Sequence, residues 1–163
     1  MKPRVYIETS VISYLTARPS RDLIVAAHQQ ITLEFWQRST EFEFYASQLV
    51  HDEAQRGDAT AAQARLAAMS SIPPLDMLPA VKSLGSRLVQ ELAIPPKALA
   101  DAYHVALAAV HGIDYLVTWN CTHIANLQMR RKIEDICRAA GYEPALIGTP
   151  PELFAVTGED YVD

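Results

Sequence analysis

The chain has 163 residues, with 14 lysines and arginines against 19 aspartates and glutamates, which gives a formal net charge of -5. This length supports one substantial hydrophobic core but not two ordinary domains, so we expect a single domain over residues 1–163. Half of the residues are hydrophobic and a fifth are charged, which excludes a disordered chain. The acidic balance argues against general electrostatic binding of nucleic acid, because neutralising phosphates requires clustered lysine and arginine.

Membrane association and disulfide bonding are not expected. No apolar run approaches the roughly 20 residues that cross a bilayer, and the N-terminus enters a strand-like segment without the apolar core of a signal peptide. Cys121 and Cys137 are too far apart for a CxxC pair and too few for a disulfide framework, so we expect reduced thiols. A cytoplasmic location follows from this interpretation.

Short apolar segments alternate along the chain with longer segments of helical periodicity. Such alternation predicts an α/β fold with a central, mostly parallel sheet. The five expected strands are residues 4–7, 43–46, 75–78, 115–117 and 145–147. The expected helices are one that begins at Val11, then 21–39, 47–57, 59–69, 79–92 and 98–111, followed by a further helix after Asn126. Because ligands bind at the carboxyl ends of parallel strands, the residues that follow each strand are the candidates for function.

Glu8 ends the first expected strand, and Thr9 and Ser10 follow it. Either of the two hydroxyl residues could cap the helix from Val11. An acid at this position either complements the helix dipole or lies at the mouth of a functional cleft. From the local sequence alone, both interpretations stay open.

Glu53 lies in the helix that follows the second expected strand and that we expect to stop at Gly57. Its polar neighbours make a solvated helix face one interpretation of the segment. Its helical spacing from Leu49 and Val50 lets the side chain point toward the inner side of the helix. Glu53 is therefore the second candidate acid.

Asp101 lies in the first turn of an expected helix that is apolar on nearly all sides, as buried helices are. A partly desolvated carboxylate is costly unless it pairs with donors or with a cation. Asp101 therefore either caps nearby amides or binds a ligand, and its place near the strand ends favours a functional site. His104 shares its helix face and is either a satisfied core or supporting residue, or a metal ligand.

The segment after the fourth expected strand is polar and carries three further candidates. We expect Thr118, Asn120 and His123 to face the same cleft, with Trp119 in the core or the cleft wall. Asn120 either offers its amide to a metal or a phosphate, or only favours the turn. The densest basic run, 130–132, is a solvated helix face or a contact for an RNA backbone.

Four blocks of this sequence together resemble the PIN domain, and most closely the VapC-type toxins of bacterial type II toxin-antitoxin modules. The third and fourth blocks are the most specific, and the likeness covers almost the entire chain. The blocks are Tyr6-Ile-Glu-Thr-Ser, Glu53-Ala-Gln-Arg-Gly-Asp58, Ala100-Asp-Ala-Tyr-His-Val-Ala-Leu-Ala and Thr118-Trp-Asn120.

The resemblance implies a three-layer α/β/α sandwich and a ribonuclease that depends on Mg²⁺ or Mn²⁺. It places the metal-binding acids at Glu8, Glu53 and Asp101 and the fourth acidic position of the family at Asn120, and we expect Thr9 and Asn120 to orient water or phosphate. Glu8, where the family usually has aspartate, is one methylene longer, and Asn120 removes a negative charge. These departures could mean one-metal chemistry, a preference for Mn²⁺ or reduced activity, because Mg²⁺ demands near-ideal octahedral geometry.

The resemblance also implies an RNA substrate, a small antitoxin partner that covers the cleft, and self-association as a homodimer or larger homo-oligomer. The apolar stripe of residues 21–39 could supply that surface, although core packing explains it equally well. A second hypothesis is a catalytically weak PIN-like module that binds a protein or RNA. A phosphotransfer or phosphatase domain is disfavoured, because no aspartate follows the first strand and no glycine-rich phosphate loop occurs.

Overall fold

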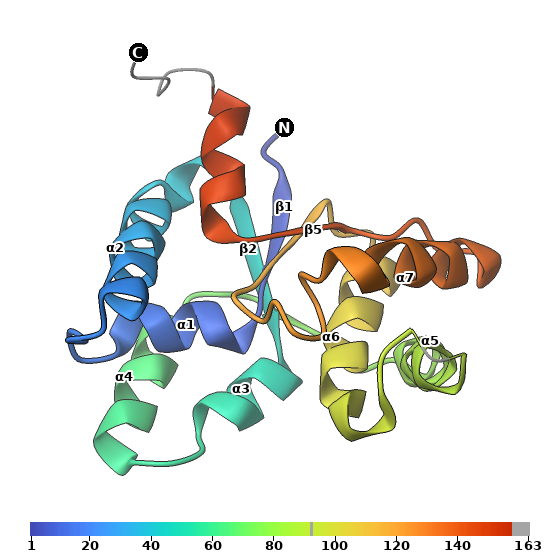
Figure 1. Ribbon diagram of the computed structural model, residues 1–163, viewed down its shortest axis with the longest axis horizontal. Coiled ribbons are helices and arrows are strands. Elements are labelled where there is room, and N and C mark those ends of the chain that lie inside the picture. Colours follow the sequence, from blue (N-terminus) through green and yellow to red (C-terminus); the bar gives the residue numbers. More distant parts are fainter. Residues whose placement is uncertain (92, 158–163) are drawn as a thin grey trace.

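The computed structural model describes residues 1–91 and 93–157 of the chain (Figure 1). Its strands form one five-stranded sheet in the order β3-β2-β1-β4-β5, and every pairing is parallel. The expected five-stranded sheet is confirmed, and it is wholly parallel in this part of the chain. The strands are β1 (Arg4–Ile7), β2 (Glu43–Ser47), β3 (Pro74–Leu75), β4 (Tyr115–Val117) and β5 (Leu146–Gly148).

Each expected helix is present, with its ends shifted by a few residues. The α-helices are α1 (Thr9–Thr16), α2 (Leu23–Gln37), α3 (Gln48–Ala54), α4 (Ala59–Ala68), α5 (Pro79–Gln90), α6 (Leu99–Val110) and α7 (Leu127–Ala139). Short 3-10 segments cover Ser39–Glu41, Pro96–Ala98 and Pro150–Thr157. Leu92, the expected end of the helix from Pro79, lies outside the described residues.

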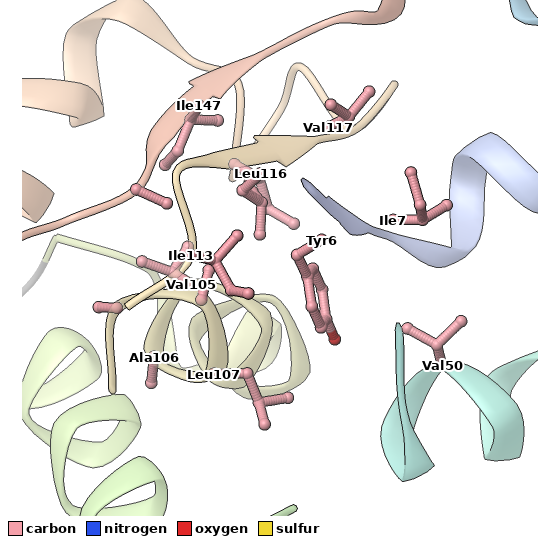
Figure 2. Close-up of a cluster of buried hydrophobic side chains, with 14 of the residues drawn as sticks. Tyr6, Ile7, Val50, Val105, Ala106, Leu107, Ile113, Leu116, Val117 and Ile147 are labelled. Carbon is pink, nitrogen blue, oxygen red and sulfur yellow. The ribbon is translucent and has the colours of Figure 1, made fainter. Parts of the chain in front are cut away.

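The helices cover both faces of the sheet, which gives three layers (Figure 1). The side chains of Tyr6 and Leu116 point toward α6, whereas those of Ile7 and Val117 point toward the opposite face (Figure 2). All four residues are fully buried, as expected for strands of a parallel sheet that is covered on both sides. Among the described residues, no helix has the length and apolar character that crossing a membrane requires.

Two details of the expected elements differ in the structure. The third strand was expected at 75–78, but it ends at Leu75, because Leu78 is the N-cap of α5 and Pro79 opens that helix. The apolar stripe expected on α2 packs inward only in part, since Phe35 is fully buried whereas Leu23 is 86% exposed.

The topology brings distant segments to one edge of the sheet. The central strand β1 pairs with β2 on one side and with β4 on the other. The segments that leave these three strands at their carboxyl ends begin with Glu8, with α3 and with Thr118. In an open parallel sheet this is where ligands bind, because the connections on either side of the central strand diverge.

Candidate metal centre

Glu8 is the residue that links β1 to α1, and its side chain is bound by donors from two elements. It is 5% exposed and is itself the N-cap of α1. Its Oε2 accepts hydrogen bonds from the backbone N–H of Ser10 (3.1 Å), from the Ser10 hydroxyl and from the Thr118 hydroxyl (2.7 Å). The expectation that Thr9 or Ser10 caps a helix from Val11 is therefore wrong, because the longer glutamate side chain reaches back to the first turn.

Glu53 projects from α3, which begins directly after β2. Its Oε1 accepts hydrogen bonds from the Thr9 hydroxyl (2.7 Å) and from His104 Nε2 (2.6 Å). The Glu53 side chain is 20% exposed. The inward direction expected from its helical spacing is thus what the structure shows, and Thr9 supports this carboxylate directly.

His104 lies on α6 and is fully buried, and both of its ring nitrogens are hydrogen-bonded. Nε2 is hydrogen-bonded to the Glu53 carboxylate, and Nδ1 is 2.7 Å from the Tyr6 hydroxyl. The Tyr6 hydroxyl is in turn 2.7 Å from the Ser47 hydroxyl at the end of β2. His104 is therefore a buried, fully satisfied histidine that contacts a candidate metal ligand.

Glu8, Glu53 and His104 form a compact group of possible ligands. One ligand atom from each lies within 4.8 Å of the others, although 45 residues separate Glu8 from Glu53 in the sequence. Among the described residues, no hydrogen bond reaches Oε1 of Glu8 or Oε2 of Glu53. Each carboxylate thus uses one oxygen for the scaffold and retains the other, an arrangement that suits a hard divalent cation.

Asp101 lies outside that compact group. Its Oδ2 accepts a hydrogen bond from His123 Nδ1 at 3.0 Å, and both side chains are about one-fifth exposed. Asp101 precedes His104 by one helical turn on α6 and acts on it through its charge. The structure therefore joins two of the three expected acids closely and pairs the third with His123. That all three acids hold one ion stays a prediction.

The loop after β4 supports the centre through its hydroxyl and amide groups. Thr118 is fully buried, donates to Glu8 and accepts the backbone N–H of Asn120 at 2.9 Å. The side-chain oxygen of Asn120 accepts the backbone N–H of His123 at 3.1 Å. Of the two interpretations of Asn120, the turn is therefore the one that accounts for its oxygen in this structure.

Trp119 belongs to a cluster beside this loop. Its ring is stacked on His28, with centroids 4.1 Å apart, and its Nε1 donates to the Thr32 hydroxyl at 2.8 Å. In the basic run, Arg130 donates to the carbonyl of Ile147 at 2.8 Å, whereas residues 131–132 are exposed on α7. These contacts place Trp119 partly buried against the core and agree with a solvated face for the outer part of the basic run.

The charges of Glu53 and His104 stabilise each other. Burial alone would raise the pKa of Glu53, but the hydrogen bond and charge of His104, with the bond from Thr9, outweigh burial and lower it. Burial alone would lower the pKa of His104, but the bond to Glu53 and the charges of Glu8 and the other carboxylates raise it. Burial also raises the pKa of Tyr6 well above its usual value, so its hydroxyl stays protonated. The lowered pKa of Glu53 and the raised pKa of His104 both favour the ionised Glu53–His104 pair.

Three residues of the site were not expected from the sequence as supporting groups: Tyr6, Ser10 and Ser47. The only local signal is that a tyrosine in the middle of a buried strand usually requires a partner for its hydroxyl. Ser47 also caps α3 by accepting the backbone N–H of Val50 at 3.2 Å, which is an ordinary role for a serine between a strand and a helix.

Comparison with known proteins gives a fold but no family assignment. No family model matches the chain, and no curated protein matches it. A chain in the crystal structure of VapBC2 from Rickettsia felis, bound to a DNA fragment from their promoter, superposes with a TM-score of 0.56. The superposition covers 90% of this chain and 98% of that one, at 15% sequence identity. At this identity the likeness concerns the fold, and the expected PIN-like three-layer α/β architecture is confirmed.

Proposed function

We propose that this protein is a metal-dependent endoribonuclease and the toxin of a VapC-like toxin-antitoxin module. The observation that carries the proposal is the meeting of Glu8 and Glu53 at the carboxyl edge of a parallel sheet, each with one oxygen uncommitted among the described residues. The PIN-like fold and the likeness to a VapBC2 chain support the same assignment.

The donor set fits Mg²⁺ or Mn²⁺, because both cations prefer carboxylate oxygens. Glu8 and Glu53 would hold the ion, with Asp101 completing the acidic group from the first turn of α6. Such an ion supplies a water of lowered pKa and neutralises charge on a scissile phosphate. Thr118 and Ser10 hold the Glu8 carboxylate, and Thr9 holds that of Glu53. We infer that His123 holds Asp101 and that the Asn120 amide orients the phosphate or the attacking water. By family resemblance, the products carry a 5′-phosphate and a 3′-hydroxyl.

The test is cleavage of labelled RNA by the purified protein with Mg²⁺, with Mn²⁺ and with a chelator. Asp101→Asn removes one acid while keeping its shape, and we expect at least a hundredfold loss of rate if it binds the ion, since losing a positioned charge typically costs this much. Asp114→Asn is the matched control, because Asp114 lies at the opposite end of β4 and binds the backbone N–H of Arg4. Cleavage that survives both chelation and Asp101→Asn would overturn the proposed metal-dependent mechanism.

A catalytically weak binding module is the second candidate, and one observation favours it. The side-chain oxygen of Asn120 is occupied by a turn, so the fourth acidic position of the family contributes neither charge nor an uncommitted oxygen. Titration calorimetry separates the two candidates. The binding-module hypothesis predicts no measurable affinity for Mg²⁺ or Mn²⁺, whereas the nuclease requires it.

The proposed partners are an RNA substrate, an antitoxin protein and a second copy of the chain. Leu23 and Ile24 at the start of α2 are 86% and 70% exposed, and we propose this end of α2 as the protein contact. Light scattering on the purified protein measures the oligomeric state, and a monomer at all concentrations would remove the self-association from the proposal.

A further inference from the structure

A chain of three buried side chains lies behind the Glu53 carboxylate. His104 contacts Glu53, Tyr6 contacts His104, and Ser47 contacts Tyr6, at distances of 2.6, 2.7 and 2.7 Å. These three side chains are at most 2% exposed. They come from α6, β1 and the end of β2, so three separate elements contribute to this chain of hydrogen bonds. Figure 2 shows the Tyr6 ring directed from β1 toward the space between α6 and α3, with its hydroxyl at the far end.

The contacts form a closed circuit. The Ser47 hydroxyl accepts the backbone N–H of Val50 in the first turn of α3, and α3 is the helix that carries Glu53. The circuit therefore runs from Glu53 through His104, Tyr6 and Ser47 and returns to α3. Because each link is buried and hydrogen-bonded, the imidazole cannot turn without leaving a polar atom unpaired, which is costly away from water.

This circuit determines which Glu53 oxygen remains for a ligand. His104 and Thr9 both donate to Oε1, so Oε2 is the oxygen of this carboxylate that remains for a ligand. A carboxylate held in this way loses less conformational freedom when it binds a cation than one that rotates freely.

We propose that Tyr6, supported by Ser47, is a positioning residue that fixes the His104 ring and thereby aims Glu53 Oε2 at the cation. The inference rests on the proposed metal centre and extends it to residues that contact neither the cation nor RNA. Tyr6 acts only through His104.

The variant Tyr6→Phe removes one hydroxyl and keeps the buried ring. Tyr45→Phe is the matched control, because Tyr45 pairs with Tyr6 in the register of β1 and β2 and takes no part in the circuit. For Tyr6→Phe we expect Mn²⁺ affinity, measured by calorimetry, to fall about tenfold, the lower end of the effect of removing groups behind metal ligands. The control should stay within about twofold of the unaltered protein.

A second readout needs no metal. In the metal-free protein, Tyr6→Phe should shift the ¹⁵N resonance of His104 Nδ1 and the carboxylate ¹³C resonance of Glu53, and Tyr45→Phe should move neither. A role in packing alone would leave both resonances in place. If Tyr6→Phe does not fold, Ser47→Ala removes the next link and should shift the same two resonances in the same sense.

The outcomes separate this inference from the proposed function. Unchanged Mn²⁺ affinity together with an unchanged Glu53 resonance in Tyr6→Phe would overturn the positioning role while leaving the nuclease intact. If the unaltered protein binds no Mg²⁺ or Mn²⁺, the nuclease fails, and the Glu53 resonance alone decides whether Tyr6 orients that carboxylate.

Discussion

The Glu53–His104 pair should make the stability of the metal-free protein depend on pH in a defined window. The pKa of His104 is raised from 6.5, so its contribution is complete below 6.5 and is lost as pH rises through the folded value. The pKa of Glu53 is lowered from 4.5, so its contribution is present above 4.5 and is lost as pH falls through the folded value. The coupling between the two residues should therefore be largest between pH 4.5 and 6.5.

The size of this coupling follows from the geometry. The two atoms are 2.6 Å apart, His104 is fully buried and Glu53 is 20% exposed. A hydrogen bond to a charged group contributes about 1.5 to 3 kcal/mol. Because Glu53 is partly exposed, we expect the coupling free energy of the ionised pair to be about 2 kcal/mol. Above the folded pKa of His104, the coupling should be smaller, because only the bond from the neutral ring to the ionised carboxylate remains.

A double-mutant cycle measures this directly. The unaltered protein, His104→Leu, Glu53→Leu and the double variant are unfolded with urea in the presence of a chelator, at about pH 5.5 and about pH 9. The cycle cancels the cavity and packing effects of each single change to a first approximation. A coupling energy that is the same at both pH values would refute the ionised pair, and a coupling near zero at pH 5.5 would show that the contact stabilises nothing.

Two further predictions concern Thr118 and the cysteines. Thr118→Val keeps the shape of the side chain but removes the donor to Glu8, so it should lower the free energy of unfolding by about 1 to 3 kcal/mol and Mn²⁺ affinity about tenfold; unchanged urea unfolding and calorimetry would contradict this. Burial raises the pKa of Cys137 to about 11, whereas Cys121 is exposed. A chromogenic thiol reagent at pH 8 should therefore label Cys121 quickly and Cys137 only on unfolding, and two equally fast thiols would count against the buried position of Cys137.

The fold was predictable to the level of element order, because its signals are local. Apolar runs that are buried on both faces mark the parallel strands, and helical spacing marks the connections. The limits of these local signals appear in α2, where the sequence left open whether the apolar stripe packs on the core or forms a contact surface, and the structure buries Phe35 but exposes Leu23. The helical spacing of apolar residues does not show which part of a helix meets a neighbouring element, and here the polar residue Thr32 is buried beside Phe35.

The sequence predicted which residues gather at the candidate site, but not which of them are hydrogen-bonded to one another. Asp101 and His104 share a helix face, as expected, yet each finds its hydrogen-bond partner elsewhere, in His123 and Glu53. These partners lie 22 and 51 residues away, so no local spacing encodes them. Tyr6 escaped notice for the same reason, because the strand pattern identified its burial but not the elements that its hydroxyl reaches.

Glu8 stands where the PIN domains that this chain resembles usually have aspartate, and its contacts show how the longer side chain is held. A glutamate in place of aspartate adds a rotatable bond, which by itself increases the conformational freedom lost when a ligand binds. In this structure two donors from Ser10 and one from Thr118 converge on a single oxygen of Glu8, and the helix terminus that Glu8 caps favours its charge. These contacts hold the longer side chain in one position before any cation arrives. The extra methylene is therefore compatible with a preorganised metal ligand, provided that Thr118 and the first turn of α1 keep their places.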